Sequence, residues 1–154
     1  MNEWMEAQLV SKTLSGTGGG GSLVSTSPDF QVRTAAIAGV IPTLRTLAAD
    51  LAMRQDFDLD SVEDLRMAVD EACGLLVPAS SDGELHCDFT VSPEQMVIKV
   101  SIHATDPSVL EEDSMSWQLL TALTTTAQRS VTKTGSQTHE LSIEITRRCG
   151  TTSL

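Results

Sequence analysis

The sequence contains no tyrosine, and aromatic residues make up only 3% of its 154 residues. Hydrophobic residues account for 40% of the chain, so its core must be largely aliphatic, built from Leu, Val, Ile, Ala and Met. This length is enough for one ordinary domain with a core but not for two. No apolar run approaches a membrane span, and the chain does not begin with a basic segment followed by an apolar one. We therefore expect a cytoplasmic protein without membrane contact.

Basic residues are scarce, with 10 Lys and Arg against 21 Asp and Glu, which gives a formal charge of −11. Each DNA phosphate that a protein neutralises requires a Lys or Arg, and a strongly acidic chain repels the duplex as a whole. This balance opposes direct DNA binding and favours a basic protein partner. An acidic surface also improves solubility without any partner, and that explanation stays open.

The three cysteines, Cys73, Cys87 and Cys149, are far apart and form no CxxC pair or Cys/His cluster. The spacing therefore predicts no structural zinc and no other metal site. Cys73 and Cys87 lie within apolar patterns, which is typical of small buried residues in a reducing compartment.

The first 29 residues have a different composition from the rest of the chain. Residues 1–14 place Met1, Met5 and Leu9 four apart, as in a short amphipathic helix. Residues 15–29 are rich in Gly and Ser and resemble the flexible spacers of engineered fusions. One interpretation is a native tail. The other, which the spacer favours, is a tethered partner peptide that docks in cis or on a neighbouring chain.

Periodicity predicts the elements of a folded domain over residues 30–148, followed by a tail at 149–154. The order β-α-α-β-β-α-β-β predicts an α+β, two-layer sandwich, with an antiparallel or mixed sheet and its helices on one face. The expected strands are 30–34, 85–91, 96–102, 130–134 and 141–145, and the expected helices are 38–55, 60–76 and 114–123.

Local chemistry predicts where the helices begin and end. Pro42 should lie in the first turn of the first helix, where its missing N–H costs nothing. Asp60 is expected to cap the second helix, with Glu63 completing a capping box. Pro78 should end that helix, and Asp113 or Ser114 should begin the third.

The stretch VEDLRMAVDEAC, residues 62–73, resembles the second helix of RsbW-type anti-sigma factors. These are serine-protein kinases of the GHKL, or histidine-kinase-like ATPase, superfamily. The resemblance extends through residues 44–54 and 108–123, covers roughly residues 30–148, and is similar to the actinobacterial, mycobacterial-type branch. It implies the histidine-kinase-like (Bergerat) fold, which has the element order predicted above.

The resemblance also implies a nucleotide site, which this sequence retains only in part. In active members a helix Glu acts as base or orients the attacking hydroxyl, and an Asn four residues later binds Mg²⁺. Here Glu71 matches the base, but Leu75 stands at the Asn position and offers the cation no oxygen. Asp106 matches the adenine-binding acid, yet Pro107 follows it, and the lid region 111–117 has no glycine. We expect a degenerate site that binds no cofactor.

A second set of residues is implied to bind partners. Arg45 matches an arginine at the family's shared docking surface for sigma factor and anti-anti-sigma factor, and its planar fork suits a carboxylate. Arg33, Asp56 and Asp58, together with Asp60, are expected to contribute to the same surface. The alternative is that Arg45 is a solvated helix charge near Asp50.

The resemblance therefore implies an anti-sigma factor that sequesters a stress- or sporulation-type sigma factor. An anti-anti-sigma protein of the STAS type would release it, and a homodimer would fit the family. Two alternatives remain open. One is an ATP- and Mg²⁺-dependent serine kinase acting on the anti-anti-sigma factor, and the other is a pseudo-ATPase module with a non-sigma partner.

Overall fold

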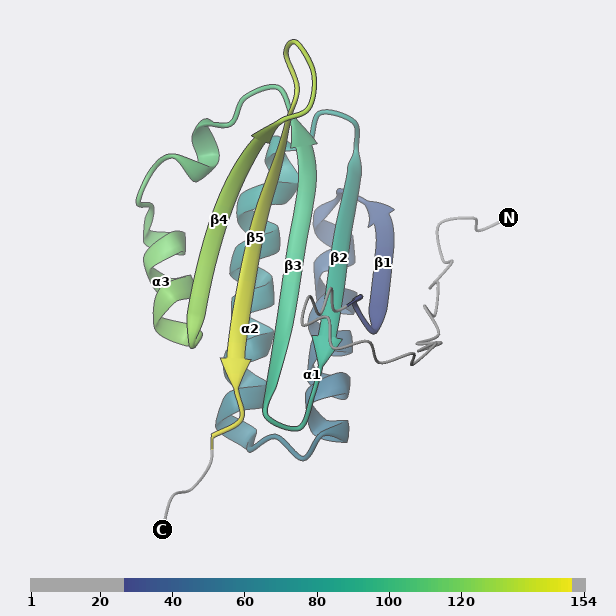
Figure 1. Cartoon of the computed structure of the whole chain (residues 1–154), viewed down its shortest axis with the longest axis vertical. Coiled ribbons are helices and arrows are strands. Elements are labelled where there is room, and N and C mark those ends of the chain that lie inside the picture. Colours follow the sequence, from purple (N-terminus) through teal and green to yellow (C-terminus); the bar gives the residue numbers. More distant parts are fainter. Residues whose placement is uncertain (1–26, 151–154) are drawn as a thin grey trace, which may run out of the picture.

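The computed structural model describes residues 27–150, which form a sheet with two long helices, α1 (Ile41–Arg54) and α2 (Leu59–Leu76), packed on one face (Figure 1). The predicted peptide 1–14 lies outside the described residues, as do most of the linker 15–29 and most of the tail 149–154. The domain boundaries proposed for those segments therefore stay predictions.

The observed element order matches the predicted one. Two short 3₁₀ turns adjoin the helices, at Ala38–Val40 and Val77–Ala79, and a third, Ser108–Leu110, follows the third strand. The strands are β1 (Phe30–Ala35), β2 (Glu84–Val91), β3 (Gln95–Ala104), β4 (Thr126–Lys133) and β5 (His139–Arg148), and the helices are α1 (Ile41–Arg54), α2 (Leu59–Leu76) and α3 (Met115–Leu123).

The five strands pair in the order β1-β2-β3-β5-β4, and each pairing between described strands is antiparallel. In β2 and β3 buried and half-buried residues alternate, because one face of the sheet meets the helices and the other does not. The register places Ile98 of β3 opposite Phe89 of β2 and Ile145 of β5, and all three side chains are fully buried. The predicted two-layer α+β fold is confirmed.

Helix α2 lies between α1 on one side and α3 on the other (Figure 1). Its inward stripe includes Leu65, Val69 and Leu76, which have no exposed surface. Cys73 of α2 and Cys87 of β2 are also buried, and burial raises the pKa of the Cys73 thiol to about 12. Both cysteines therefore serve as small apolar core residues, as predicted.

The helix termini confirm most of the local predictions. Pro42 lies in the first turn of α1, and the Ser114 side chain caps α3 by accepting a hydrogen bond from the Trp117 N–H. The prediction that Asp60 caps α2 is wrong. Asp58 is the cap: its carboxylate accepts from the Ser61 N–H at 3.1 Å and from the Ser61 hydroxyl at 2.6 Å.

The same carboxylate also holds the end of the last strand. The Gly150 N–H donates to Asp58 Oδ1 at 3.0 Å, so one side chain joins the start of α2 to the chain after β5. This tertiary contact, between residues far apart in sequence, favours Asp58 over Asp60 as the cap. None of the helices described within residues 27–150 is long and apolar enough to cross a membrane.

The Asp58 cap predicts a pH-dependent contribution to stability. Asp58→Ala removes the cap, so we expect the free energy of unfolding to fall by about 1 kcal/mol at pH 7 in urea denaturation. Hydrogen bonds from Ser61 hold the pKa of Asp58 below its ordinary value of 3.8. The stabilisation is therefore present above that value and lost as the pH falls through the lower folded-state pKa.

Asp60→Ala is the matched control, because that carboxylate makes no cap hydrogen bond to Ser61. It should lower the free energy of unfolding by less than Asp58→Ala does at pH 7. The difference in free energy of unfolding between wild type and Asp58→Ala should become smaller below about pH 4. A loss from Asp60→Ala equal to that from Asp58→Ala would show that the cap is wrongly assigned.

Candidate functional site

The two flanks of α2 present different chemistry. Asp70 lies on the flank that faces α1, where it pairs with Arg45. Asp64 lies on the other flank and pairs with Arg147 of β5 at 3.1 Å. Glu71 follows Asp64 by two helical turns, and Leu75 follows Glu71 by one, so both lie on this second flank. The helix thus separates the region predicted to be a degenerate nucleotide site from the α1 surface.

The structure places Leu75 where it cannot act as a polar ligand. Its side chain is partly buried and packs against the core cluster. Glu71, one turn earlier, is half-buried, and its carboxylate has no hydrogen bond or ion pair with the part of the chain that the structure describes. Within residues 27–150 there is also no group of three or more His, Cys, Asp and Glu residues suited to a metal ion.

Asp106 lies just beyond β3, at the end of the sandwich where α2 also ends (Figure 1). Its carboxylate is exposed and accepts a hydrogen bond from the Ser108 N–H at 2.9 Å, which lowers its pKa. Aspartate commonly bonds the backbone two residues on in this way, in an Asx turn. The geometry is that of a turn residue; its role towards adenine stays a prediction.

The segment that resembles a lid folds against α2 and β4. Leu120 of α3 is fully buried, and α3 packs directly on α2. Arg129 of β4 stacks on Trp117, with its guanidinium carbon 4.6 Å from the ring centre, and pairs with Asp113 at 2.7 Å. Trp117 is half-buried against the core. Its contact with Arg129 was not predicted, because nothing local in sequence links the two residues.

Arg45 extends from α1 to α2 and pairs with Asp70 at 2.8 Å. Its partner is therefore not Asp50, which pairs with Arg54 one turn along α1. The docking role of Arg45 stays a prediction. Both partners remain partly exposed, with 32% of the Arg45 side chain and 38% of the Asp70 side chain accessible. The pair therefore lies at the outer surface of the helical layer, where a partner protein can reach it.

The other predicted docking residues do not gather around Arg45. Arg33 lies on β1 opposite His86 of β2, on the face of the sheet that the helices leave open, and pairs with Glu84 at 2.8 Å. Asp56 and Asp58 lie in the connection between α1 and α2, beyond the far end of α1 from Arg45. The expectation of one shared surface is therefore wrong for Arg33, which lies on the other face of the sheet. The α1–α2 connection belongs to the same helical layer as Arg45 but does not lie beside it.

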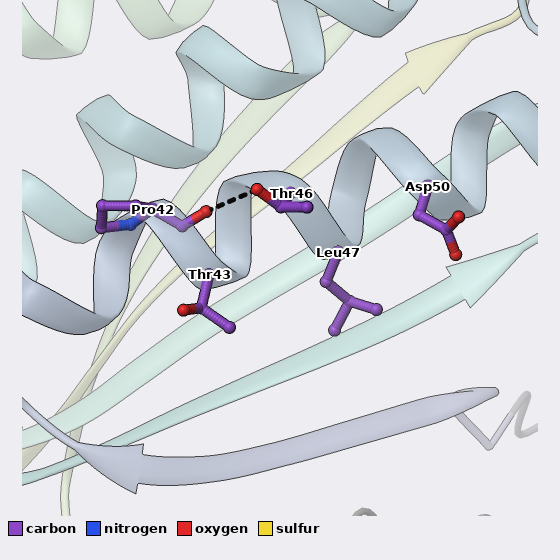
Figure 2. Close-up of a pocket in the computed structure, with 5 residues that line it drawn as sticks. All are labelled: Pro42, Thr43, Thr46, Leu47 and Asp50. Carbon is purple, nitrogen blue, oxygen red and sulfur yellow. Dashed lines mark hydrogen bonds between the residues drawn. The ribbon is translucent and has the colours of Figure 1, made fainter.

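An open hollow of about 500 Å³ lies along α1, on the outer side of the helix. Figure 2 shows Thr43 and Leu47 projecting from the same side of α1, one turn apart. Leu47 is partly buried and packs against the core cluster, and it also forms part of this hollow. The lining residues are Pro42, Thr43, Thr46, Leu47 and Asp50.

The exposure of the Arg45–Asp70 pair predicts a small contribution to stability. Ion pairs in contact with solvent contribute about 1 kcal/mol or less, because water screens them. A double-mutant cycle with Arg45→Ala and Asp70→Asn, followed by urea denaturation, should give a coupling energy below about 1 kcal/mol. A coupling of several kcal/mol would mean that Arg45 mainly holds the two helices together.

Comparison with curated proteins finds relatives of one description, from two strains of one species. No known family model matches the chain. Two curated proteins described as anti-sigma-F factor RsbW, from Mycobacterium tuberculosis strains CDC 1551 / Oshkosh and ATCC 25618 / H37Rv, are each 37% identical over 81 residues. The match covers 52% of this chain and 48% of each relative, so the chain spans about half the length of the curated relatives it matches.

Among solved structures, the crystal structure of the SiaB-SiaC complex from Pseudomonas aeruginosa contains a chain with a similar fold, with a TM-score of 0.63. The alignment covers 75% of this chain and 88% of that one, at 5% sequence identity, so it supports the fold alone. The chain is thus similar in sequence to the RsbW-type anti-sigma factors, on a two-layer fold consistent with the histidine-kinase-like class.

Proposed function

We propose that this protein is a cytoplasmic anti-sigma factor that sequesters an alternative sigma factor of the stress or sporulation type. The observation that carries the proposal is the 37% sequence identity to anti-sigma-F factors over 81 residues. That match covers 48% of each relative's length. Binding alone is sufficient for such a function. A nanomolar complex corresponds to about −12 kcal/mol and requires no chemical step.

The helical layer supports this proposal as the docking surface. Arg45 is a partly exposed arginine whose guanidinium already bonds one carboxylate, and such a group adapts well to a carboxylate or aromatic ring on a partner. A STAS-type anti-anti-sigma protein that competed for an overlapping surface would release the sigma factor. A homodimer would place two such surfaces on one particle.

We further propose that the protein acts without nucleotide. Mg²⁺ takes oxygen ligands, and Leu75 supplies only hydrocarbon at the position where the family has an amide. Pro107 and the glycine-free segment 111–117 offer no backbone cradle for phosphates. In addition, α3 packs against α2 through buried leucines, on the flank that carries Glu71 and Leu75.

Arg45→Ala should weaken binding of a sigma-F factor, the class named in the relatives' description. We expect a loss of about tenfold or more in affinity by calorimetry, as for an arginine at the centre of an interface. Arg33→Ala is the matched control, because it removes another ion-paired arginine from the open face of the sheet. Equal losses from both variants would place the docking surface elsewhere, and no binding by wild type would refute the function.

Titration of the wild-type protein with Mg·ATP should give no saturable heat. Leu75→Asn restores a possible Mg²⁺ ligand but neither the lid nor the adenine-box glycine, so we expect that this variant also binds no nucleotide. Saturable micromolar binding by the wild type, or phosphate transfer to a STAS-type protein, would instead support the alternative of a serine kinase with an unusual nucleotide site.

A further inference from the structure

Three large apolar side chains are exposed on the hairpin of α1 and α2. Met53, in the last turn of α1, is 56% exposed, and Leu59, at the start of α2, is 74% exposed. Met67, two turns further along α2, is 44% exposed. In an aliphatic protein whose other large apolar side chains mostly form the core, three exposed on one hairpin suggest a contact surface.

Their positions bring them to one side of the hairpin. Leu59, Glu63 and Met67 follow one another at intervals of four residues, so they form one outward row on α2. The two helices run antiparallel, with Arg45 near the start of α1 paired to Asp70 near the end of α2. The last turn of α1, with Met53, therefore lies beside the first turns of α2. We call Met53, Leu59 and Met67 the hairpin patch.

Acidic residues lie beside the Leu59 end of the hairpin patch. The basic residues nearby are already paired, Arg54 with Asp50 at 2.8 Å and Arg66 with Glu63 at 3.6 Å. Asp56 and Asp60 flank Leu59 and are both exposed, and neither forms an ion pair with another residue of the described range 27–150. The patch thus presents apolar side chains beside two uncompensated negative charges.

We infer that the hairpin patch binds a basic amphipathic helix of the partner protein. Apolar residues of that helix would contact Met53, Leu59 and Met67, while Lys or Arg side chains at its edges would face Asp56 and Asp60. Methionine is flexible and polarisable, which suits it to an apolar surface that binds a partner helix. The inference rests on the proposed function and extends its docking surface from Arg45 to the tip of the hairpin.

Charge argues against two other occupants. A second copy of the chain docked on the hairpin patch would bring the exposed carboxylates of Asp56 and Asp60 against the same carboxylates of its partner. The N-terminal residues 1–14 carry Glu3 and Glu6 against the single basic residue Lys12, so they do not complement an acidic rim. A basic partner segment removes the repulsion that either of these occupants would meet.

The test uses a synthetic amphipathic helical peptide of Leu and Lys as its probe, titrated into the full chain by calorimetry. Leu59→Gln and the double variant Met53→Gln/Met67→Gln should each weaken peptide binding about tenfold or more. Met115→Gln is the matched control, because Met115 is 85% exposed on α3, away from the hairpin. Unchanged thermal unfolding of each variant shows that the fold is intact.

Equal peptide binding by the Met115→Gln variant and the patch variants would overturn the inference. A wild-type dimer that dissociates on Leu59→Gln substitution would also overturn the inference, because a second copy would then occupy the patch. Tighter peptide binding after removal of residues 1–26 would overturn it too, because the N-terminal segment would then be the occupant. A parallel titration with a sigma-F factor separates the two proposals. If wild type and the patch variants bind the sigma-F factor equally well, the patch is refuted but the proposed function is not. If wild type binds the peptide but not the sigma-F factor, the proposed function is refuted and the patch stays supported.

Discussion

The packing of α2 against the sheet is the interaction on which the rest of the structure depends. Leu65, Val69 and Leu76 are completely buried on its inward side, and each buried leucine or valine contributes about 1.5–3 kcal/mol. Because that side is buried in the core, only the flanks and the outer row of the helix can contact a ligand or a partner. One flank carries Asp70 and its contact with Arg45, and the other carries Glu71 and Leu75.

If the nucleotide site is degenerate, as proposed, this division would let it change without loss of the docking surface proposed on the α1 side. The two flanks of α2 contact different elements, α1 on one side and α3 with β5 on the other. An apolar residue at position 75 packs against the core and so need not reduce stability, whereas a buried amide without a ligand would cost about 1–3 kcal/mol. Packing therefore favours leucine over an unliganded amide at position 75.

Periodicity in the sequence was enough to predict the fold, because its aliphatic stripes match the observed buried faces closely. The helix cap was not predictable in the same way. Asp58 and Asp60 are both suitable caps by local chemistry, and the contact that distinguishes them comes from Gly150, at the other end of the domain. The pairing of Arg45 with Asp70 likewise joins residues 25 apart in sequence.

The position of Arg33 was within reach of sequence reasoning. Val32 and Thr34 face the helical layer, so the residue between them must face away from it by strand alternation alone. The roles of Glu71, Asp106 and the docking acids are different. They depend on ligands that the fold does not specify, so they stay predictions until a partner is bound.

In the proposed docking to the helical layer, two kinds of interaction would act at different stages of binding. The acids Asp56 and Asp60 would attract a basic partner at a distance, which would raise the association rate and make it sensitive to salt. Apolar contacts and Arg45 would act only after docking, when water has left the interface, and they would mainly set the dissociation rate. A competing protein that covered Arg45 but not the hairpin tip would therefore remove one part of the short-range contact while leaving the long-range attraction. Release by such a competitor would be more complete at higher ionic strength, because the remaining attraction is the part that salt screens.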